Sequence, residues 1–280
     1  MTNPDSAFTA HNGFTLPAQG LGTYNLRGED GADAVRNGIE SGYRLIDSAF
    51  NYENEGAVGW GVSGAAIDPS ELVVTTKLAG RHHPAHRASV AIEESRFRLA
   101  VESIDLLLIH WPNPERDEYV DAWGAMIDAR ERGLVRQIGV SNFLPEHLER
   151  IEKATGVRPV VNQIELHPHF PQADALAYHR ENGIITEAWS PIGRARDVVA
   201  DDVIVEIAEA HRATPVQVIL AWHQARGVVA IPKAADPAHQ KQNLAALNLT
   251  LNDDEVAAIT ALGRADGRLF GADPATHEEL

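Results

Sequence analysis

Cysteine is absent from this chain of 280 residues, which excludes disulfide bonds, cysteine-ligated zinc or iron–sulfur sites and thiolate nucleophiles. Basic residues are also scarce, because 24 Lys and Arg stand against 40 Asp and Glu, a formal net charge of −16. That balance argues against binding to nucleic acids or anionic membranes, which need clustered Lys and Arg. A hydrophobic share of 44% with 23% charged residues still indicates a folded globular protein.

Long apolar runs are missing as well. The most apolar stretches, residues 72–74 and 104–109, are far shorter than the roughly 20 residues that a membrane-spanning helix needs. The first residues, MTNPD, have neither the basic start nor the apolar run of a secretory signal. We therefore expect a cytoplasmic protein without membrane or nucleic-acid partners, and we expect it to be a monomer.

Short apolar runs alternate along the chain with longer amphipathic segments. The runs are rich in Leu and β-branched residues without polar alternation, which is typical of strands buried on both faces. The expected strands are residues 20–23, 45–47, 72–76, 105–109, 137–140, 160–163, 185–188 and 228–231. Helical patterns lie between them, for example at residues 118–131 and 145–151.

Strands that alternate with helices predict parallel β-α units. Eight units in 280 residues, about 35 residues each, match a closed (β/α)₈ TIM barrel better than an open sheet. A hairpin around residues 8–16, centred on Asn12 and Gly13, is expected to cap the barrel floor. No linker-like segment interrupts residues 1–280, so we expect a single α/β domain.

Reactive side chains follow the expected strands. Active sites of such barrels form at the C-terminal ends of the strands. The residues at those positions are Asp47, Lys77, His110, Ser141, Asn142, Gln163, Trp189, Ser190 and Lys233. These side chains should converge on one pocket rim.

Four residues suit acid–base chemistry. A phenol such as Tyr52 titrates near 10, and a neighbouring Lys77 ammonium would make it a better acid. Asp47 would hold Lys77 charged and in place, while His110 could orient a carbonyl oxygen by a hydrogen bond. A structural ion pair between Asp47 and Lys77 is the plainer alternative.

Several motifs resemble the aldo-keto reductase family. Residues 42–49 (GYRLIDSA), followed by Tyr52 and residues 55–59 (EGAVG), are similar to the family signature. Residues 105–112 (DLLLIHWP), 139–143 (GVSNF) and 162–168 (NQIELHP) are similarly characteristic. The resemblance covers about residues 14–266, and the segment after Trp111 resembles bacterial members of the diketogluconate reductase type.

The resemblance implies an NADPH-dependent reductase that moves hydride to the carbonyl carbon of aldehydes, α-dicarbonyls or keto-sugars. Tyr52 would be the proton donor, assisted by Lys77, Asp47 and His110. The residues implied in cofactor binding are Ser141, Asn142 and Gln163 on the carboxamide, Trp189 stacked on the nicotinamide, Ser190, and Lys233, His239, Gln242 and Asn243 farther along the cofactor. The implied substrate wall consists of Tyr24, Phe50 and Trp111, with Phe270 able to close it.

The region implied to bind the adenosine 2′-phosphate departs from the family pattern. Ala234 stands where Ser is usual, His239 where Arg is usual, and Gln242 where Glu is frequent. The loss of a hydroxyl and a permanent guanidinium removes two phosphate contacts. We therefore expect a weakened preference for NADPH, with some use of NADH. The final segment, residues 266–280, is expected to be mobile.

Two other readings stay open. One is a non-catalytic nicotinamide-nucleotide sensor or accessory subunit on the same fold, and the other is a metal-dependent barrel isomerase or hydrolase that uses Asp47, Glu165, His110 and His167. We expect no metal at the histidine-rich residues 81–86 or 165–169, because Pro interrupts both. Residues 59–64 (GWGVSG) match a dinucleotide-binding fingerprint, but no strand precedes them and they are predicted to lie in a helix.

Overall fold

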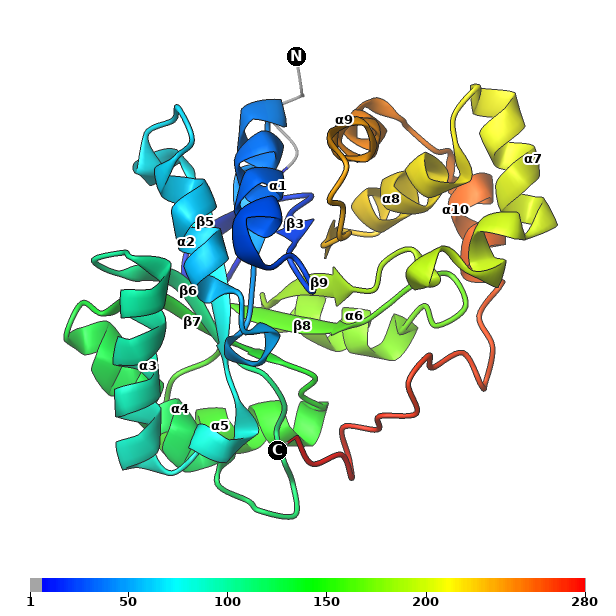
Figure 1. Cartoon of the computed structure of the whole chain (residues 1–280). Coiled ribbons are helices and arrows are strands. Elements are labelled where there is room, and N and C mark those ends of the chain that lie inside the picture. Colours follow the sequence, from blue (N-terminus) through cyan, green and yellow to red (C-terminus); the bar gives the residue numbers. More distant parts are fainter. Residues whose placement is uncertain (1–6, 280) are drawn as a thin grey trace.

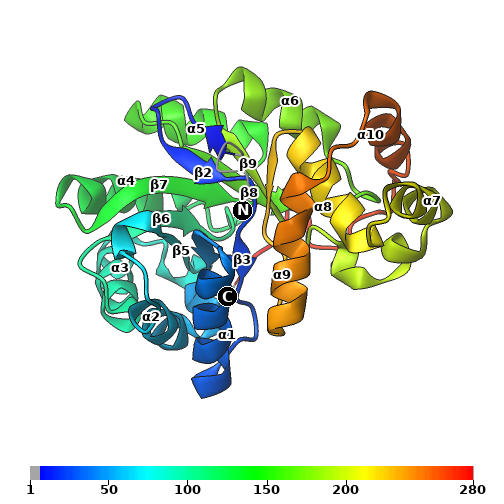
Figure 2. The same cartoon turned by 90° about the horizontal axis from the view of Figure 1, so that it is seen from above.

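The computed structural model describes residues 7–279, and in it eight parallel strands form a barrel surrounded by helices (Figure 1, Figure 2). The strands β3 to β10 pair with their neighbours in chain order. Bridges from Gln19 to Ala230 and from Gly22 to Lys233 join the first strand to the last and close the barrel. The predicted (β/α)₈ fold is thus confirmed. Residues 1–6 and 280 of the expected domain lie outside the described residues.

The strands occupy the predicted places to within two residues at either end. Their bounds are β3 (Leu21–Gly22), β4 (Leu45–Asp47), β5 (Val73–Leu78), β6 (Ile104–Ile109), β7 (Val135–Ser141), β8 (Val161–Glu165), β9 (Ile185–Trp189) and β10 (Val228–Ala230). The helices are α1 (Gly28–Ser41), α2 (Glu55–Ser63), α3 (Ala85–Leu99), α4 (Tyr119–Glu131), α5 (Pro145–Thr155), α6 (Ala173–Glu181), α7 (Asp202–His211), α8 (Pro215–Ala225), α9 (Pro237–Ala245) and α10 (Asp253–Thr260).

An N-terminal hairpin lies against one end of the barrel, as predicted. Strands β1 (Ala7–Thr9) and β2 (Thr15–Pro17) are antiparallel, and Phe8 pairs with Leu16. Leu16 is fully buried in a cluster with Leu45, Val161 and other strand residues. Since these residues stand at the starts of their strands, the hairpin covers the N-terminal end and leaves the C-terminal ends open for a site.

Two helices lie outside the ring of helices that covers the barrel. Figure 2 shows α7 and α10 beside α8, on its outer side. Trp222 of α8 is fully buried, and its Nε1 donates a hydrogen bond to Thr260 Oγ1 at 2.9 Å. Ile204 and Ile259 bury their side chains in the same cluster. From residue 261 to residue 279, the last one described, the chain forms neither helix nor strand.

Residues 59–64 lie in α2 and at its end, not in a loop that follows a strand. A Cβ at Gly59 would lie 2.3 Å from the backbone oxygen of Leu99, and one at Gly61 would lie 2.5 Å from that of Ala32. These glycines therefore allow close helix packing, and the helix predicted there is confirmed. No helix among residues 7–279 has the length and apolar character required to span a bilayer.

Candidate active site

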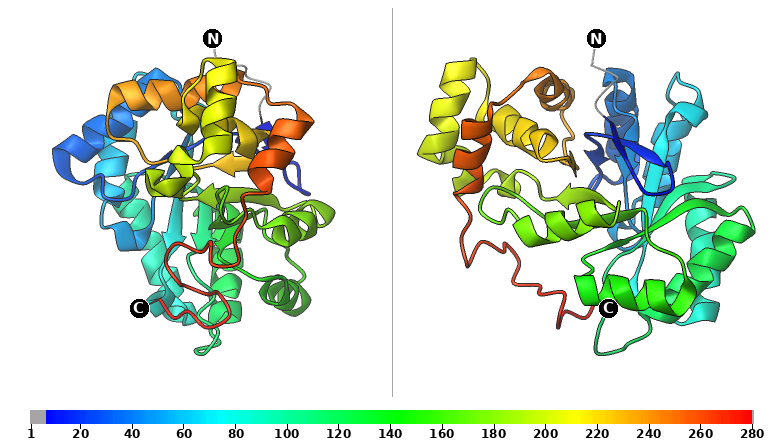
Figure 3. Two further views of the ribbon diagram at one scale, coloured as in Figure 1. Left: turned by 90° about the vertical axis from the view of Figure 1, so that its right-hand side faces the viewer. Right: turned by 180° about the vertical axis from the view of Figure 1, so that it is seen from behind.

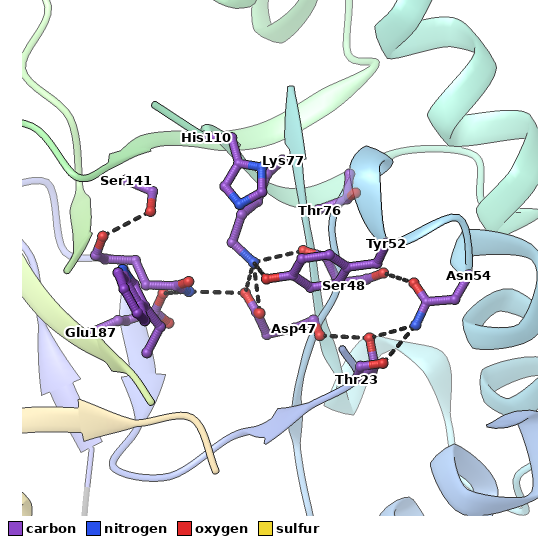
Figure 4. A network of polar contacts seen from close by, with 12 residues as sticks. Thr23, Asp47, Ser48, Tyr52, Asn54, Thr76, Lys77, His110, Ser141 and Glu187 are labelled. Carbon is purple, nitrogen blue, oxygen red and sulfur yellow. Dashed lines mark hydrogen bonds and ion pairs between the residues drawn. The ribbon is translucent and has the colours of Figure 1, made fainter. Parts of the chain in front are cut away.

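A buried ion pair lies at the C-terminal ends of β4 and β5. Lys77 Nζ lies 2.7 and 2.8 Å from the two carboxylate oxygens of Asp47, and it donates to the backbone oxygen of Ser48 at 2.8 Å (Figure 4). The two side chains are 1% and 5% exposed. Burial is the largest single effect and disfavours the ammonium, but the charge and hydrogen bond of Asp47, together with Tyr52 and Glu187, outweigh it and raise the pKa of Lys77. Folding therefore holds a charged Lys77 in one position.

Tyr52 lies beside this pair, on a 3₁₀ helix (Phe50–Tyr52) that follows β4. Its hydroxyl oxygen lies 3.5 Å from Lys77 Nζ. Burial raises the pKa of the Tyr52 phenol above its ordinary value, while the Lys77 charge acts in the opposite direction. The ammonium thus acts as predicted, but the net increase in acidity expected from the sequence is wrong because burial has the larger effect. Tyr52 therefore keeps its proton at neutral pH.

A hydrogen-bond network that sequence reasoning missed braces the chain around Tyr52. The side-chain amide of Asn54 donates to the backbone oxygens of Thr23, at 2.7 Å, and Leu26, at 2.9 Å. Its oxygen accepts from Ser48 Oγ at 2.8 Å, and Thr23 Oγ1 donates to the backbone oxygen of Asp47 (Figure 4). These bonds connect both sides of Tyr52 to the barrel rim. The sequence signal that could have indicated this network was the presence of two polar residues, Ser48 and Asn54, on either side of Tyr52.

His110 follows β6 and faces Tyr52 across the site. The two ring centroids are 5.9 Å apart and the rings are nearly perpendicular. The backbone N–H of His110 donates to Leu78 at 3.0 Å, and its backbone oxygen accepts from Asn142 Nδ2 at 3.0 Å. The imidazole is 13% exposed, and its Nδ1 lies 2.7 Å from a carboxylate oxygen of Glu279. Sequence reasoning did not identify Glu279.

The opposite wall carries hydroxyl, amide and indole groups from β7, β8 and β9. Ser141 Oγ donates to the backbone oxygen of Gln163 at 2.8 Å. Asn142 Nδ2 donates to Ser141 Oγ, while Asn142 Oδ1 accepts from Trp189 Nε1 at 2.8 Å. The backbone is in the left-handed region at Asn142, with φ of 63°, and at Ser190, with φ of 49°. The structure thus brings together the residues that the sequence predicts for the nicotinamide end of a cofactor.

Glu187 is a buried acid that sequence reasoning also missed. Gln163 Nε2 donates to Glu187 Oε2 and to Asp47 Oδ2, both at 2.9 Å, so it joins the two walls (Figure 4). Burial first, and the charge of Asp47 second, raise the pKa of Glu187 to about 8, although Gln163 and Lys77 act against them. An acidic residue within the doubly buried strand β9 was the available signal.

A cavity of about 710 Å³ opens between these walls, within the range of small-molecule sites. Of the predicted residues, those that line it are Tyr24, Asp47, Tyr52, His110, Trp111, Ser141, Asn142, Gln163, Trp189, Ser190, Lys233 and Phe270. The segment after α10 adds Ala272 and His277, which were not predicted. The residues predicted from distant parts of the chain therefore meet around one space, as the barrel fold requires.

Aromatic rings form the rim of this cavity. Tyr24 is about half exposed and lies edge-on to Tyr52, with 5.1 Å between centroids. Trp111 packs 4.3 Å from the His277 ring. Phe50 does not line the cavity in the described chain: its ring lies 4.8 Å from His82 and borders a separate space of about 420 Å³. The structure thus places Phe50 apart from the other two predicted substrate residues.

The residues predicted for the adenosine end lie around α9, beyond the cavity. Lys233 is exposed at the cavity rim, and His239 and Gln242 are exposed on the helix. Asn243, on the same helix, is buried. Asp236, which sequence reasoning did not consider, accepts hydrogen bonds from the N–H groups of Ala238 and His239 at the helix N-terminus.

Within residues 7–279, no three His, Cys, Asp or Glu side chains are arranged to hold a metal ion. Glu165 and His167 contact each other, 3.2 Å apart, and Glu165 accepts from the backbone N–H of Leu269. The cavity does fit a nicotinamide cofactor. Trp189 offers an indole face, Ser141, Asn142 and Gln163 offer hydrogen-bonding groups suited to a carboxamide, and the exposed ammonium of Lys233 suits a phosphate.

These features define a class: barrel oxidoreductases that act on carbonyl groups with a nicotinamide cofactor. The chain belongs to the aldo-keto reductase family, since the family model matches residues 19–264. It is 48% identical over 270 residues to 2,5-diketo-D-gluconic acid reductase B of Corynebacterium sp. (strain SHS752001), covering 96% of this chain and 97% of that protein.

Two further comparisons support the same family. Methylglyoxal reductase DkgA of Salmonella typhimurium is 39% identical over 275 residues, which cover 98% of each chain. A crystal structure of a Gox0644 variant in complex with NADPH is 42% identical, covers 97% of this chain and 98% of that one, and superposes with a TM-score of 0.92. The chain is accordingly an NADPH-dependent aldo-keto reductase.

Proposed function

We propose that this enzyme reduces aldehydes, α-dicarbonyls or keto-sugars, with Tyr52 as the proton donor. The observation that carries the proposal is the placement of the Tyr52 hydroxyl, 3.5 Å from a buried ammonium and at the wall of the cavity. The names of the relatives, reductases of diketogluconic acid and of methylglyoxal, support the substrate classes.

The catalytic residues have complementary roles in this proposal. NADPH supplies a hydride to the carbonyl carbon when it is bound. Tyr52, which is protonated at neutral pH, donates its proton to the carbonyl oxygen. Lys77 stabilises the phenolate that remains, and Asp47 keeps Lys77 charged and in position. His110 orients the carbonyl oxygen by a hydrogen bond.

The remaining predicted residues would bind the two ligands. Tyr24 and Trp111 would contact the substrate at the cavity rim, whereas Phe50 is supported by the sequence resemblance alone. The residues assigned to NADPH are Ser141, Asn142, Gln163, Trp189, Ser190, Lys233, His239, Gln242 and Asn243, and NADH is expected as a weaker alternative. We further propose that the chain acts as a single barrel domain, as a monomer and in the cytoplasm.

Tyr52→Phe tests the proposal because it removes the proton donor and keeps the ring. We expect kcat with methylglyoxal to fall by about 10²–10⁴-fold, the usual contribution of general acid catalysis. The dissociation constant of NADPH, measured by quenching of tryptophan fluorescence, should change little. Tyr178→Phe is the matched control, since it removes a phenol from α6, away from the residues that line the cavity, and it should retain turnover.

Near-normal turnover of the Tyr52→Phe enzyme would show that the assignment is wrong. The same assay, run with NADPH and NADH against a panel of aldehydes, α-dicarbonyls and keto-sugars, distinguishes this function from the two alternatives left open by the sequence. Cofactor binding without turnover of any substrate would indicate a sensor or accessory subunit. Turnover that EDTA abolishes and that needs no nicotinamide would indicate a metal-dependent isomerase or hydrolase.

A further inference from the structure

The segment that follows α10, residues 261–279, is here called the C-terminal segment, and it crosses the mouth of the barrel. Figure 1 and Figure 3 show it, in red, leaving α10 and running toward the half of the molecule that holds α3, α4 and α5. The sequence predicted mobility here, but the segment ends in a set of specific contacts made by Glu279, the last described residue. Glu279 therefore has a defined place beside His110.

The main chain of Glu279 is anchored by the loops after β5 and β6. Asn113 is fully buried, and its Nδ2 donates to the backbone oxygen of Glu279 at 2.7 Å. Its Oδ1 accepts from the backbone N–H of Glu279 at 3.0 Å. A Cβ on Gly80 would lie 2.2 Å from Asn113 Nδ2 and 2.6 Å from the Glu279 oxygen, so glycine is required for this close approach.

The Glu279 carboxylate is fully engaged and only 12% exposed. Its Oε1 accepts from Asn51 Nδ2 at 2.6 Å and lies 2.7 Å from His110 Nδ1, while Oε2 accepts from the backbone N–H of Gly80 at 2.9 Å. Burial opposes its ionisation, but the close contact with His110 and the N–H groups of Gly80 and Asn51 lower the pKa of Glu279 to about 2. The group is thus a carboxylate throughout the neutral range.

The carboxylate reaches His110 from outside the cavity. His110 and Tyr52 line the cavity, whereas Glu279 does not line it among the described residues. His110 Nδ1 is buried and makes no aligned hydrogen bond, and the Glu279 oxygen lies 2.7 Å from it. Because a carboxylate has only acceptor atoms, a hydrogen on Nδ1 is the form of the ring that suits this contact. The other ring nitrogen, Nε2, is then left for the substrate side.

We propose that Glu279 is a positioning residue that holds the hydrogen on Nδ1 of His110 and the ring plane toward the substrate carbonyl. The proposal rests on the proposed role of His110 in the reaction. A carboxylate that fixes the tautomer and orientation of an imidazole is a general device of enzyme sites. Here Glu279 of the segment after α10 supplies it, so His110 is held in this way only when that segment is docked.

Other charged or titratable groups surround the Glu279–His110 pair. They are Tyr52 and the Lys77–Asp47 pair on the cavity side, His277 on the C-terminal segment, Arg81 against Asn51, His83 behind Gly80, and Arg116 with Glu278. Burial is the largest cause that lowers the pKa of His83 to about 4, so this ring is neutral near pH 7. The dominant charge facing Nδ1 is therefore that of Glu279.

Glu279→Ala and Glu279→Gln in the full chain test the proposal, with Glu278→Gln as the matched control. Glu278 lies on the same segment but contacts Arg116 and the backbone of Glu115. We expect kcat for methylglyoxal to fall about 10–100-fold in Glu279→Ala, the loss typical when a group that orients a histidine is removed. Glu279→Gln should alter the pH profile of kcat, and NADPH affinity should change little in all three variants.

A change in KM alone, with kcat and its pH profile unchanged, would overturn the proposal and leave Glu279 as a latch for the segment. An NMR readout keeps the test independent of turnover: the His110 ring-proton shifts across the pH range should change in Glu279→Gln and not in Glu278→Gln. Unchanged His110 shifts would also overturn the proposal. A wild-type enzyme without turnover, in contrast, would contradict the proposed function. The NMR measurement alone would then test whether Glu279 acts on His110.

Discussion

The proposed site has a catalytic end around Lys77 and an adenosine end around α9, beyond the cavity, and the two ends hold their charges in different ways. At the catalytic end, Lys77 and Asp47 are almost completely buried and each contacts several partners. At the adenosine end, Lys233 and His239 are exposed on the surface, and Asp236 places a carboxylate at the start of α9. Buried charges are fixed by their partners, whereas exposed ones are screened by salt and sensitive to the solution.

This difference separates the reaction from the choice of cofactor. A buried pair cannot lose one member without leaving an uncompensated charge, so the catalytic end should tolerate few changes. The exposed residues near α9 can be exchanged one at a time at little cost to the fold. We therefore expect catalysis and stability to be linked at one end and cofactor preference to vary independently at the other.

The largest effect should follow from breaking the buried pair. Asp47→Ala leaves the Lys77 ammonium without its carboxylate, and we expect the free energy of unfolding to fall by about 3–5 kcal/mol. Activity should fall as well, because Lys77 is then no longer held charged beside Tyr52. Chemical denaturation measures the first effect and NADPH oxidation the second.

The double variant Asp47→Ala with Lys77→Met provides the control for this prediction. It removes both charges and should recover part of the lost stability without recovering activity. A loss below about 1 kcal/mol in Asp47→Ala would mean that the pair contributes no more than a surface ion pair, and the contrast between the two ends would disappear.

Glu187 should make the catalytic end sensitive to pH. Its pKa rises from an ordinary 4.5 to about 8 in the folded protein, so the folded state keeps a proton that the unfolded chain has lost. The resulting stability is complete below pH 4.5 and is lost as the pH rises to about 8, by at most about 1.4 kcal/mol per pH unit. Glu187→Gln should flatten this decline in denaturation experiments at pH 5 to 8.

Glu53→Gln is the matched control, because the Glu53 side chain is 76% exposed. It should leave the dependence of stability on pH as it is in the wild type. If Glu187→Gln and wild type show the same slope between pH 5 and 8, then Glu187 ionises at its ordinary pH despite its burial.

At the adenosine end the effects should be smaller. Asp236→Asn keeps an oxygen for the N-terminal amides of α9 and removes the negative charge. We expect NADPH to bind about two- to fivefold more tightly at low salt, with NADH unchanged, because a charge near a helix end has an effect of this order. Tighter binding of both cofactors to the same extent would rule out an effect on the 2′-phosphate.

The smallest effect concerns His239. If its ring contacts the 2′-phosphate, His239→Arg, which supplies the permanent guanidinium usual at this position, should raise the ratio of NADPH to NADH efficiency about twofold, the order of effect of an exposed ion pair. His239→Gln is the matched control and should not raise this ratio. An unchanged ratio in His239→Arg would contradict the weakened selectivity expected from the sequence.

Much of the fold was predictable because the strands carry a local signal. Residues 104–109 are apolar and uninterrupted, and they form β6 between β5 and β7. The convergence of the proposed catalytic residues was predictable for the same reason, since Asp47 ends β4, Lys77 lies one residue before the end of β5 and His110 follows β6. The family motifs added the roles that spacing alone does not provide.

Other features depend on contacts between segments far apart in the sequence. The acidity of Tyr52 was misjudged because burial, which outweighs the Lys77 charge, exists only in the folded barrel. Glu279 is separated from His110 by more than half of the chain, and no local pattern links them. Phe50 follows Asp47 closely, yet the turn of the 3₁₀ helix directs its ring to a different space.

The amino-acid sequence by itself determined the alternation of strands and helices, the absence of thiol chemistry and the identity of the groups at the barrel mouth, because each is a matter of composition or local order. Only the tertiary structure decided which of these groups touch. It placed Lys77 between Asp47 and Tyr52, raised the pKa of Glu187 and brought Glu279 against His110. Solvent exclusion and distance govern these effects, and both arise only when the chain has closed into a barrel.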